Sequence, residues 1–343
     1  MIKVGLIGFG VMGHMHLENY IRLQAEGVQV QLVAICDVQM EQLQHAHVKG
    51  NIDTDTDTTQ IDLSVYQLYT DMEQMLTEQQ LDVIDICLPT DLHAVLAVDI
   101  LQRGYHVFIE KPMALTVAEA QTMTEAARHH NRHLMVGQCL RFWPAYEYLK
   151  ETVDSGVFGQ PLGAYLFRGG DLPSPWFLDG KRSKGAMLDM HIHDVDIVQY
   201  IFGMPDYVSS IARNVIPGSA YDMCSSNYVY ADRKVINTQV DWTLRGDYGF
   251  SMVYRVNFEH GNLVYEQGKV HVHPNDDQGY IAELSPDMGY YRQLRYFIEH
   301  LLSGEPMDRA TPESTLLSME LVEAEMTSAD RAGERVALSK VTV

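Results

Sequence analysis

The stretch GAMLDMHIHDVD, from Gly185 to Asp196, places three aspartates and two histidines within twelve residues. Carboxylates and imidazoles are the side chains that bind metal ions and that transfer protons near neutral pH. Asp189 and His193 are four residues apart, so they lie on one face of a helix. A carboxylate beside an imidazole fixes its tautomer and raises its pKa, which favours His193 as a proton acceptor. A metal site formed by Asp189, His193 and Asp196 is the alternative. Nothing outside the stretch completes that ligand set, and we expect no metal.

A helix over Met190–Phe202 would position these groups. Helical spacing turns His191 and Asp194 to other sides of this helix than Asp189 and His193. The neighbouring apolar stripe should face the core. It comprises Leu188, Ile192, Val195, Val198 and Phe202.

A second candidate site opens the chain, where a glycine-rich segment follows the first apolar run and precedes a helical pattern. Gly8 permits a tight turn, Gly10 leaves room for a pyrophosphate, and Gly13 lets helix and strand pack closely. The N-terminus of the helix offers unpaired N–H groups to the phosphates. The pattern predicts a dinucleotide site contacted by the whole segment, Gly8, Phe9, Gly10, Val11, Met12 and Gly13.

Asp37 ends the second apolar run, where a carboxylate can bind the ribose hydroxyls of the adenosine half. It would repel a 2′-phosphate, and the next residues supply no arginine, so NAD is favoured over NADP. Asp37 also suits a helix N-cap before Gln39–Gln44, and the two roles are compatible. Ligands of parallel sheets lie beyond the strand C-termini. We therefore expect four residues at the end of the fourth run and just beyond it to border the cofactor: Leu88, Pro89, Thr90 and His93.

Lys111 ends the fifth run, within Glu110-Lys111-Pro112. A lysine at this edge of a parallel sheet is well placed to meet a substrate beside the cofactor. Its side chain can hydrogen-bond a substrate hydroxyl. A solvated surface lysine is the alternative, and the flanking glutamate and proline favour the functional interpretation.

Elements that would carry these residues alternate as strand and helix over roughly the first 140 residues, the pattern of a parallel α/β sheet. Asp91–Arg103 has helical spacing, and the acidic segment Asn51–Asp62 has no periodicity and reads as an exposed loop. The expected strands are Lys3–Ile7, Val30–Cys36, Tyr66–Tyr69, Val83–Leu88, His106–Ile109 and His133–Val136.

The rhythm then changes to runs joined by turns, which favours a largely antiparallel sheet. These runs include Asn227–Ala231, Ile236–Leu244 and Ser251–Phe258, and helices return at Tyr290–Leu302 and Pro312–Ala332. The sequence thus predicts an α/β Rossmann domain over residues 1–139 and an α+β domain with a large, mostly antiparallel sheet over residues 140–343.

Composition narrows the function. The 343 residues carry a net charge of −21, which argues against nucleic-acid and anionic membrane partners. The four cysteines form no Cys-x-x-Cys pair and suit a reducing compartment, and no apolar run approaches membrane-spanning length. We expect a cytoplasmic protein with a small-molecule substrate.

Taken together, these motifs resemble the glucose–fructose oxidoreductase/inositol dehydrogenase/rhizopine-catabolism (Gfo/Idh/MocA) family. They appear in family order as Gly8-x-Gly10-x-x-Gly13, Glu110-Lys111-Pro112, Arg141-Phe142-x-Pro144 and Asp189-x-x-x-His193-x-x-Asp196. The resemblance implies reversible, NAD-dependent oxidation of a secondary alcohol on a sugar or cyclitol. It also implies a homodimer or homotetramer formed through the open face of the C-terminal sheet.

Residue roles follow from the same resemblance. Lys111 matches the lysine that hydrogen-bonds the reacting hydroxyl, His193 the acid/base, and Asp189 the aspartate that supports it, while Glu110 would approach the nicotinamide ribose. Arg168 and Trp176 are weaker candidates for substrate contact, with structural roles as the alternative. The similarity of the Asp189–Asp196 segment to inositol dehydrogenases favours cyclitols. An NAD-using glycosidase with no net redox change is the alternative function.

Overall fold

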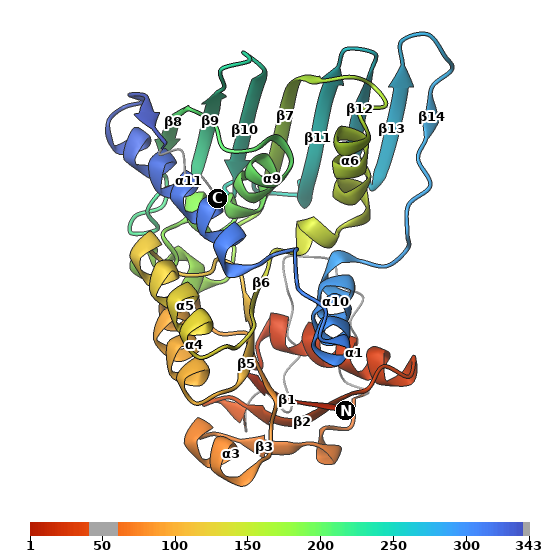
Figure 1. Cartoon of the computed structure of the whole chain (residues 1–343). Helices are drawn as coiled ribbons and strands as arrows, with labels where there is room; N and C mark the ends of the chain where they lie inside the picture. The colour runs from red at the N-terminus through yellow and green to blue at the C-terminus, as the bar shows by residue number, and fades with distance from the viewer. Residues whose placement is uncertain (41–60, 339–343) are drawn as a thin grey trace. The chain divides into compact units, whose positions relative to one another are not determined.

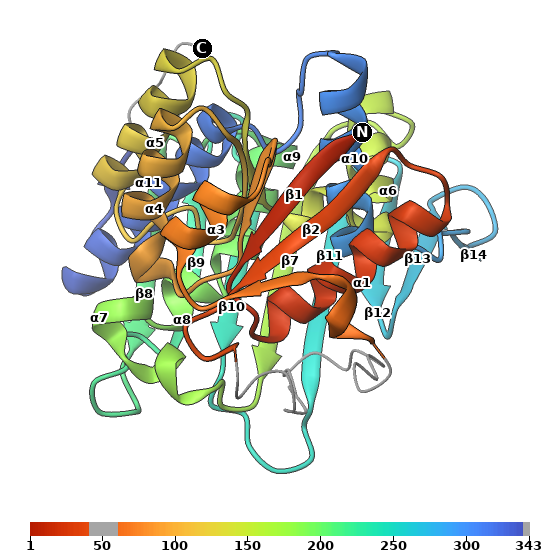
Figure 2. The same ribbon diagram turned by 90° about the horizontal axis from the view of Figure 1, so that it is seen from below.

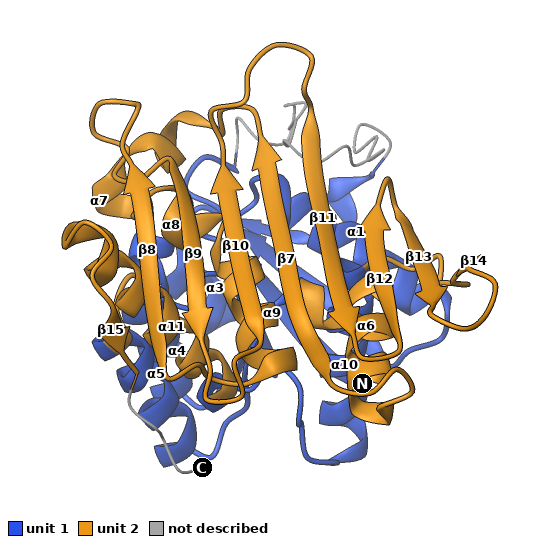
Figure 3. Cartoon of the chain, turned by 90° about the horizontal axis from the view of Figure 1, so that it is seen from above, with its two compact units in different colours: residues 1–114, 118–139, 289–313 blue, residues 115–117, 140–288, 314–343 orange. Residues whose placement is uncertain are grey.

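The structure, a computed structural model, describes residues 1–40 and 61–338, which form two compact units (Figure 3). Unit 1 contains residues 1–114, 118–139 and 289–313, and unit 2 contains residues 115–117, 140–288 and 314–343. The division expected from the sequence placed everything after residue 139 in one domain. The structure differs by adding 289–313 to unit 1. The acidic segment before Ile61 and most of the expected helix 39–44 lie outside the described residues.

Unit 1 is built on a six-stranded sheet of order β3-β2-β1-β4-β5-β6 in which every pair is parallel (Figures 1 and 2). Its central strands β4 and β5 are buried along nearly their whole length, which explains their mostly apolar sequences. All six expected strands are confirmed to within two residues at each end. They are β1 (Ile2–Ile7), β2 (Val30–Cys36), β3 (Gln67–Tyr69), β4 (Val83–Ile86), β5 (His106–Glu110) and β6 (Leu134–Gly137).

Helices connect these strands, and a further helix of unit 1, α10 (Gly289–Ser303), comes from much later in the chain. Helix α10 packs against α1 (Figure 1), where Tyr291 donates a hydrogen bond of 2.5 Å to Glu26. Arg22 lies 3.8 Å from the Tyr291 ring centroid and adds a cation–π contact. The remaining elements are α1 (Val11–Ala25), η2 (Leu63–Val65), α3 (Met72–Glu78), η3 (Thr90–Leu92), α4 (His93–Gln102) and α5 (Val117–His129).

Unit 2 is built on a nine-stranded sheet of order β14-β13-β12-β11-β7-β10-β9-β8-β15 (Figure 3). Among the described strands of this sheet, β7 and β10 are the only neighbours that pair in parallel. The sheet is therefore mostly antiparallel, as expected. Burial alternates along β8, β9 and β10, because one face packs on helices and the other does not. The strands are β7 (Pro161–Gly170), β8 (Tyr207–Arg213), β9 (Met223–Val229), β10 (Val235–Asp241), β11 (Phe250–Phe258), β12 (Gly261–Glu266), β13 (Lys269–Pro274), β14 (Tyr280–Ile281) and β15 (Val336–Ala337).

Helices of unit 2 cover one face of this sheet (Figure 3). The helix expected over Met190–Phe202 begins two residues later, at Ile192, and a separate short turn of helix precedes it. No helix within residues 1–40 and 61–338 has the length and hydropathy needed to cross a membrane. The helices are η4 (Cys139–Phe142), α6 (Pro144–Ser155), η5 (Pro175–Leu178), α7 (Gly180–Ser183), α8 (Ala186–Asp189), α9 (Ile192–Phe202) and α11 (Pro312–Asp330).

Candidate active site

The glycine-rich segment forms the turn between β1 and α1 and fits a bound dinucleotide. Gly8 has φ +93°, a conformation that side chains disfavour, and a Cβ there would lie 2.4 Å from the Cys87 carbonyl oxygen. A Cβ at Gly13 would lie 2.2 Å from the Gly8 carbonyl oxygen, so only glycine lets the helix start this close to the strand. Gly10 is different, since a Cβ there would meet nothing within 4 Å. The space beside Gly10 at the helix N-terminus is where a pyrophosphate is expected.

Phe9 and Asp37 fix this turn from the side of β2. The Phe9 ring is buried and stacks on His14, with ring centroids 3.8 Å apart. Asp37 follows β2, and its Oδ2 accepts a hydrogen bond of 2.8 Å from the Phe9 backbone N–H. Its Oδ1 accepts one of 2.7 Å from the Gln39 N–H. Asp37 thus places a fixed carboxylate next to the glycine turn, as a ligand for ribose hydroxyls requires.

Asp37→Asn should shift the cofactor preference towards NADP⁺. The amide keeps an acceptor for the Phe9 N–H but removes the charge that repels a 2′-phosphate. We expect the ratio of kcat/KM for NADP⁺ to that for NAD⁺ to rise at least about tenfold, equivalent to ~1.4 kcal/mol. Steady-state kinetics with both cofactors measures it. Asp71→Asn is the matched control, since Asp71 also follows a strand of this sheet but caps α3. An unchanged ratio in Asp37→Asn would contradict the role of the carboxylate.

The chain after β4 is held by His93. Its Nδ1 lies 2.8 Å from the Pro112 carbonyl oxygen, and its Nε2 lies 2.8 Å from that of Leu88. The ring is buried, and burial lowers its pKa. Both nitrogens therefore lie within hydrogen-bond distance of backbone carbonyl oxygens, although a neutral ring can donate to only one of them, and the ring lies between Leu88 and Pro112. The contact of these residues with the cofactor stays a prediction.

Lys111 emerges from the end of β5 and is partly exposed, whereas Glu110 and Pro112 are buried. Glu110 Oε1 lies 3.1 Å from His16 Nε2, and its Oε2 accepts a hydrogen bond of 3.3 Å from the Lys111 N–H. The sequence interpretation did not include His16. A signal was present: His16 and Tyr20 are one helical turn apart, and Asp85 is the lone acid of a buried apolar strand.

In unit 2, the stretch with three aspartates and two histidines spans α8, a break at Met190–His191, and α9. The expected apolar stripe is buried throughout, which confirms that prediction. His191 and Asp194 do turn away from His193, and each enters a buried ion pair. Asp194 accepts a hydrogen bond of 2.9 Å from Arg168 on β7, and His191 Nε2 lies 3.4 Å from Glu325 on α11. Burial lowers the pKa of His191, but the charges of Cys224 and Glu325 outweigh this and raise it well above 6.5.

Asp196 is also committed to structure. Arg141 donates two hydrogen bonds to it, of 2.8 Å from Nε and 2.6 Å from Nη2, and both side chains are buried. Ser318 donates a third, of 2.7 Å. In the candidate metal set of Asp189, His193 and Asp196, the Asp196 carboxylate could bind a cation only if its ion pair with Arg141 were broken. His193 is partly exposed, unlike His191, and Asp189 is buried at the end of α8.

The two weaker candidates for substrate contact have structural partners. Arg168 is buried and bound to Asp194, so its guanidinium supports α9. Trp176 lies in η5 and packs its ring on Phe177, with centroids 3.8 Å apart. Its partial exposure leaves an aromatic surface for a ligand, and that contact stays a prediction.

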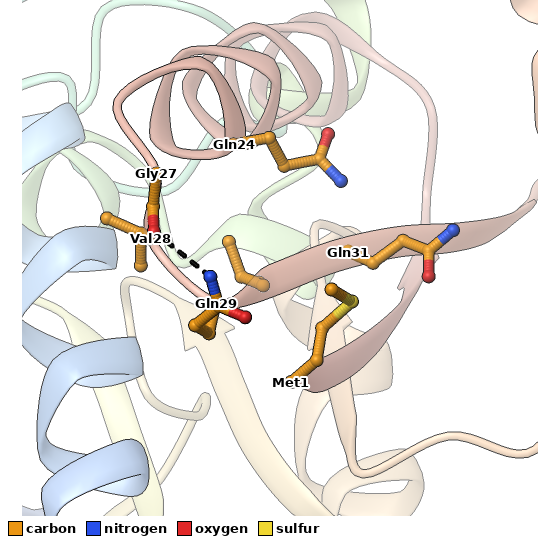
Figure 4. A pocket seen from close by; sticks show the side chains of 7 residues that line it. Met1, Gln24, Gly27, Val28, Gln29 and Gln31 are labelled. Carbon is orange, nitrogen blue, oxygen red and sulfur yellow. Dashed lines mark hydrogen bonds between the residues drawn. The ribbon is translucent and has the colours of Figure 1, made fainter.

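One surface cavity is lined by none of the candidate site residues. Its volume is about 350 Å³, and it is lined by Met1, Gln24, Gly27, Val28 and Gln29 together with the start of β2 (Figure 4). These residues sit at the amino ends of β1 and β2. Ligands of parallel sheets bind at the opposite, carboxyl end, where Gly8, Asp37 and Lys111 lie.

Comparison with known proteins supports the interpretation of both units. A model described as an oxidoreductase family with an NAD-binding Rossmann fold matches residues 2–138. A model of the GFO/IDH/MocA C-terminal domain matches residues 146–264. The chain is 28% identical over 319 residues to myo-inositol 2-dehydrogenase of Thermotoga maritima, covering 89% of this chain and 90% of that protein.

Two further relatives extend the comparison. Inositol 2-dehydrogenase of Salmonella typhimurium is 28% identical over 201 residues, and the alignment covers 58% of this chain and 54% of that protein. A structure of levoglucosan dehydrogenase in complex with NADH and levoglucosan has a TM-score of 0.84 at 18% identity. It covers 99% of this chain and 100% of that one, and at this identity it shows the fold. The chain belongs to the Gfo/Idh/MocA family of NAD-binding oxidoreductases.

Proposed function

We propose that the protein is an NAD-dependent dehydrogenase that interconverts a secondary alcohol and a ketone on a cyclitol, with an inositol as the first substrate to test. One observation carries this proposal: Lys111, Asp189 and His193 are present in a chain that aligns along 89% of its length with a protein named myo-inositol 2-dehydrogenase. Levoglucosan dehydrogenase shares the fold, so a sugar derivative is the next class to test.

Each residue has a defined part in this proposal. Gly8–Gly13 and Asp37 hold the dinucleotide, and NAD⁺ when bound supplies the hydride acceptor. Lys111 donates a hydrogen bond to the reacting hydroxyl and orients it. His193 removes the hydroxyl proton in the oxidative direction and returns it in reduction. Asp189 supports the charged form of His193.

The other charges of the α8–α9 region clarify why His193 is the base. His191, Asp194 and Asp196 are buried in pairs with Glu325, Arg168 and Arg141. Buried pairs of this kind are costly to break, so these groups are poor candidates for proton transfer. His193 is the partly exposed imidazole of the stretch.

The test is a screen of myo-inositol, scyllo-inositol, levoglucosan and common aldoses for NADH absorbance, with NADP⁺ in parallel. We expect NADH formation with at least one inositol. The alternative glycosidase function is not favoured by the names of the relatives, several of which are inositol dehydrogenases and one a hydratase. Release of p-nitrophenol from nitrophenyl glycosides without NADH build-up would overturn the dehydrogenase proposal.

We also propose a homodimer or homotetramer formed through the helix-free face of the nine-stranded sheet. This face carries exposed apolar side chains, including Ile211, which is 60% exposed, and Val235, which is 71% exposed. Ile211→Asp should therefore convert the assembly to a monomer in light scattering coupled to size exclusion. A wild-type chain that runs as a monomer at micromolar concentration would contradict this assembly.

A further inference from the structure

A buried polar cluster lies beneath the carboxyl ends of β4 and β5, inside unit 1. His16, on α1, is at its centre and is fully buried. Its Nδ1 lies 2.8 Å from Asp85 Oδ2 on β4, and its Nε2 lies 3.1 Å from Glu110 Oε1 on β5. Tyr20, one turn along α1, donates a hydrogen bond of 2.9 Å to the same oxygen of Asp85. Cys87 Sγ lies 3.3 Å from His16 Nδ1.

The geometry fixes the charge of His16. A neutral imidazole has one N–H and one lone pair, so it can donate to only one of two carboxylates. Both ring nitrogens face carboxylate oxygens, and only an imidazolium donates to both. Burial lowers the pKa of His16, but the charge of Asp85 and its hydrogen bond to the ring outweigh this and raise the pKa well above 6.5. His16 is thus a buried cation between two buried anions.

The spacing of His16 and Asp85 fits a hydrogen bond better than a shared metal ion. His16, Asp85 and Cys87 are close enough to be compared with a cation site. Ligands on a tetrahedral zinc at ~2.0–2.1 Å would stand roughly 3.3 Å apart. The 2.8 Å between Nδ1 and Oδ2 is the length of a charge-assisted hydrogen bond.

Glu110 transmits this arrangement to Lys111. Its Oε1 is bound to His16, and its Oε2 accepts the backbone N–H of Lys111. On the side of β6, a Cβ at Gly137 would lie 2.8 Å from Oε1 and 3.1 Å from Cδ, so the glycine leaves just enough room for the carboxylate. The carboxylate is therefore held on three sides, and one of its contacts is the backbone N–H of Lys111.

We propose that His16 is a positioning residue for the redox reaction: as an imidazolium bridging Asp85 and Glu110, it holds the Glu110 carboxylate against the backbone of Lys111 and thereby orients that lysine. The proposal rests on the role proposed above for Lys111. It assigns a function to a residue that lies outside the glycine turn and, being fully buried, has no surface for a substrate.

Four variants separate positioning from stability. His16→Gln removes the cation. Gly137→Ala displaces the Glu110 carboxylate while every charge is kept. Glu110→Gln removes the acceptor's charge. Tyr20→Phe is the matched control, because it removes a hydrogen bond from the same cluster that does not involve Glu110.

Kinetics with NAD⁺ and the polyol found active in the screen give the first readout. We expect His16→Gln and Gly137→Ala to lower kcat roughly tenfold or more. Tyr20→Phe should lower Tm and leave kcat within about twofold of the wild type. In the Glu110→Gln background, His16→Gln should add little further loss, because both act through one contact. Multiplicative losses in kcat, or an equal loss in Tyr20→Phe, would overturn the proposal.

Two measurements need no turnover, so they separate failure of this proposal from failure of the proposed function. The first is side-chain ¹⁵N NMR of histidine-labelled protein at pH 8, with His16→Gln used for assignment. It should show both His16 nitrogens protonated, and a neutral-tautomer signal would overturn the proposal. The second is trace acetylation read by mass spectrometry. Lys111 should react at a changed rate in His16→Gln and Gly137→Ala but not in Tyr20→Phe, and unchanged rates in the first two would overturn it.

Discussion

Replacing His193 with alanine should lower kcat about 10²–10⁴-fold while the Kd for NAD⁺ stays within about twofold. A general base contributes this factor because it accepts the hydroxyl proton as the C–H bond breaks. We expect cofactor affinity to come instead from the glycine turn and Asp37 in unit 1. Lys111→Ala should cause a loss of similar size, because the reacting hydroxyl is then no longer oriented.

The pH profile distinguishes the two variants. In the wild-type enzyme, kcat/KM for oxidation should fall at the acidic end of the profile, where His193 becomes protonated, because a protonated imidazole cannot accept a proton. His193→Ala should remove this acidic limb, and Lys111→Ala should keep it at lower overall activity. His129→Ala is the control, since His129 is an exposed histidine at the end of α5.

Stopped-flow or steady-state absorbance of NADH measures the rates, and calorimetry measures NAD⁺ affinity. His193→Ala with wild-type kcat and an intact acidic limb would show that another group takes the proton. A variant that loses NAD⁺ affinity in parallel with kcat would show that the substitution disturbed cofactor binding, and the assignment of His193 as the base would then fail.

The sequence was sufficient to predict the parallel sheet of unit 1. Buried parallel strands are mostly apolar on both faces, so β1, β2 and β4 are visible as short runs that each contain a single polar residue. The glycine turn was predictable for a related reason. Gly8 and Gly13 are required because a side chain at either position would clash with nearby backbone. Both positions lie close together in the sequence, so a short motif reveals them.

Features that depend on distant contacts were not predictable. Helix α10 joins unit 1 although eight of the nine strands of the mostly antiparallel sheet precede it, and its amphipathic pattern does not say which core it will join. The start of α9 at Ile192 was also missed. The backbone N–H groups of both Met190 and His191 bond to the Ala186 carbonyl, a break that the apolar periodicity of the stretch does not reveal.

The role of each acidic residue in the α8–α9 stretch was the hardest to read. Asp189, Asp194 and Asp196 look equivalent in sequence, because a carboxylate carries no local sign of its partner. Asp194 pairs with Arg168 and Asp196 with Arg141, residues that lie 26 and 55 positions earlier. These pairs separate structural carboxylates from the candidate catalytic one.

The second large effect is expected for Asp196→Asn, which should lower the free energy of unfolding by about 3–5 kcal/mol. Arg141 is fully buried, and Asp196 provides both oxygens of a two-pronged ion pair with it. The asparagine has nearly the same shape, but it leaves the guanidinium charge uncompensated away from water. Denaturant unfolding followed by circular dichroism measures the loss.

Two comparisons identify its cause. Asp154→Asn breaks an exposed pair with Lys150 one helical turn away, and it should cost less than about 1 kcal/mol. Arg141→Met combined with Asp196→Leu removes both buried charges, so the double variant should be more stable than Asp196→Asn alone. A double variant that is less stable than Asp196→Asn would contradict the desolvation argument.

The same substitution tests the metal alternative. If Asp196 helped to bind a catalytic ion together with Asp189 and His193, chelation of the wild-type enzyme with EDTA would lower kcat. We expect EDTA to leave kcat unchanged, because the carboxylate is occupied by Arg141 and Ser318. Asp196 would then act on the reaction only by holding α9, and with it His193, in place within unit 2.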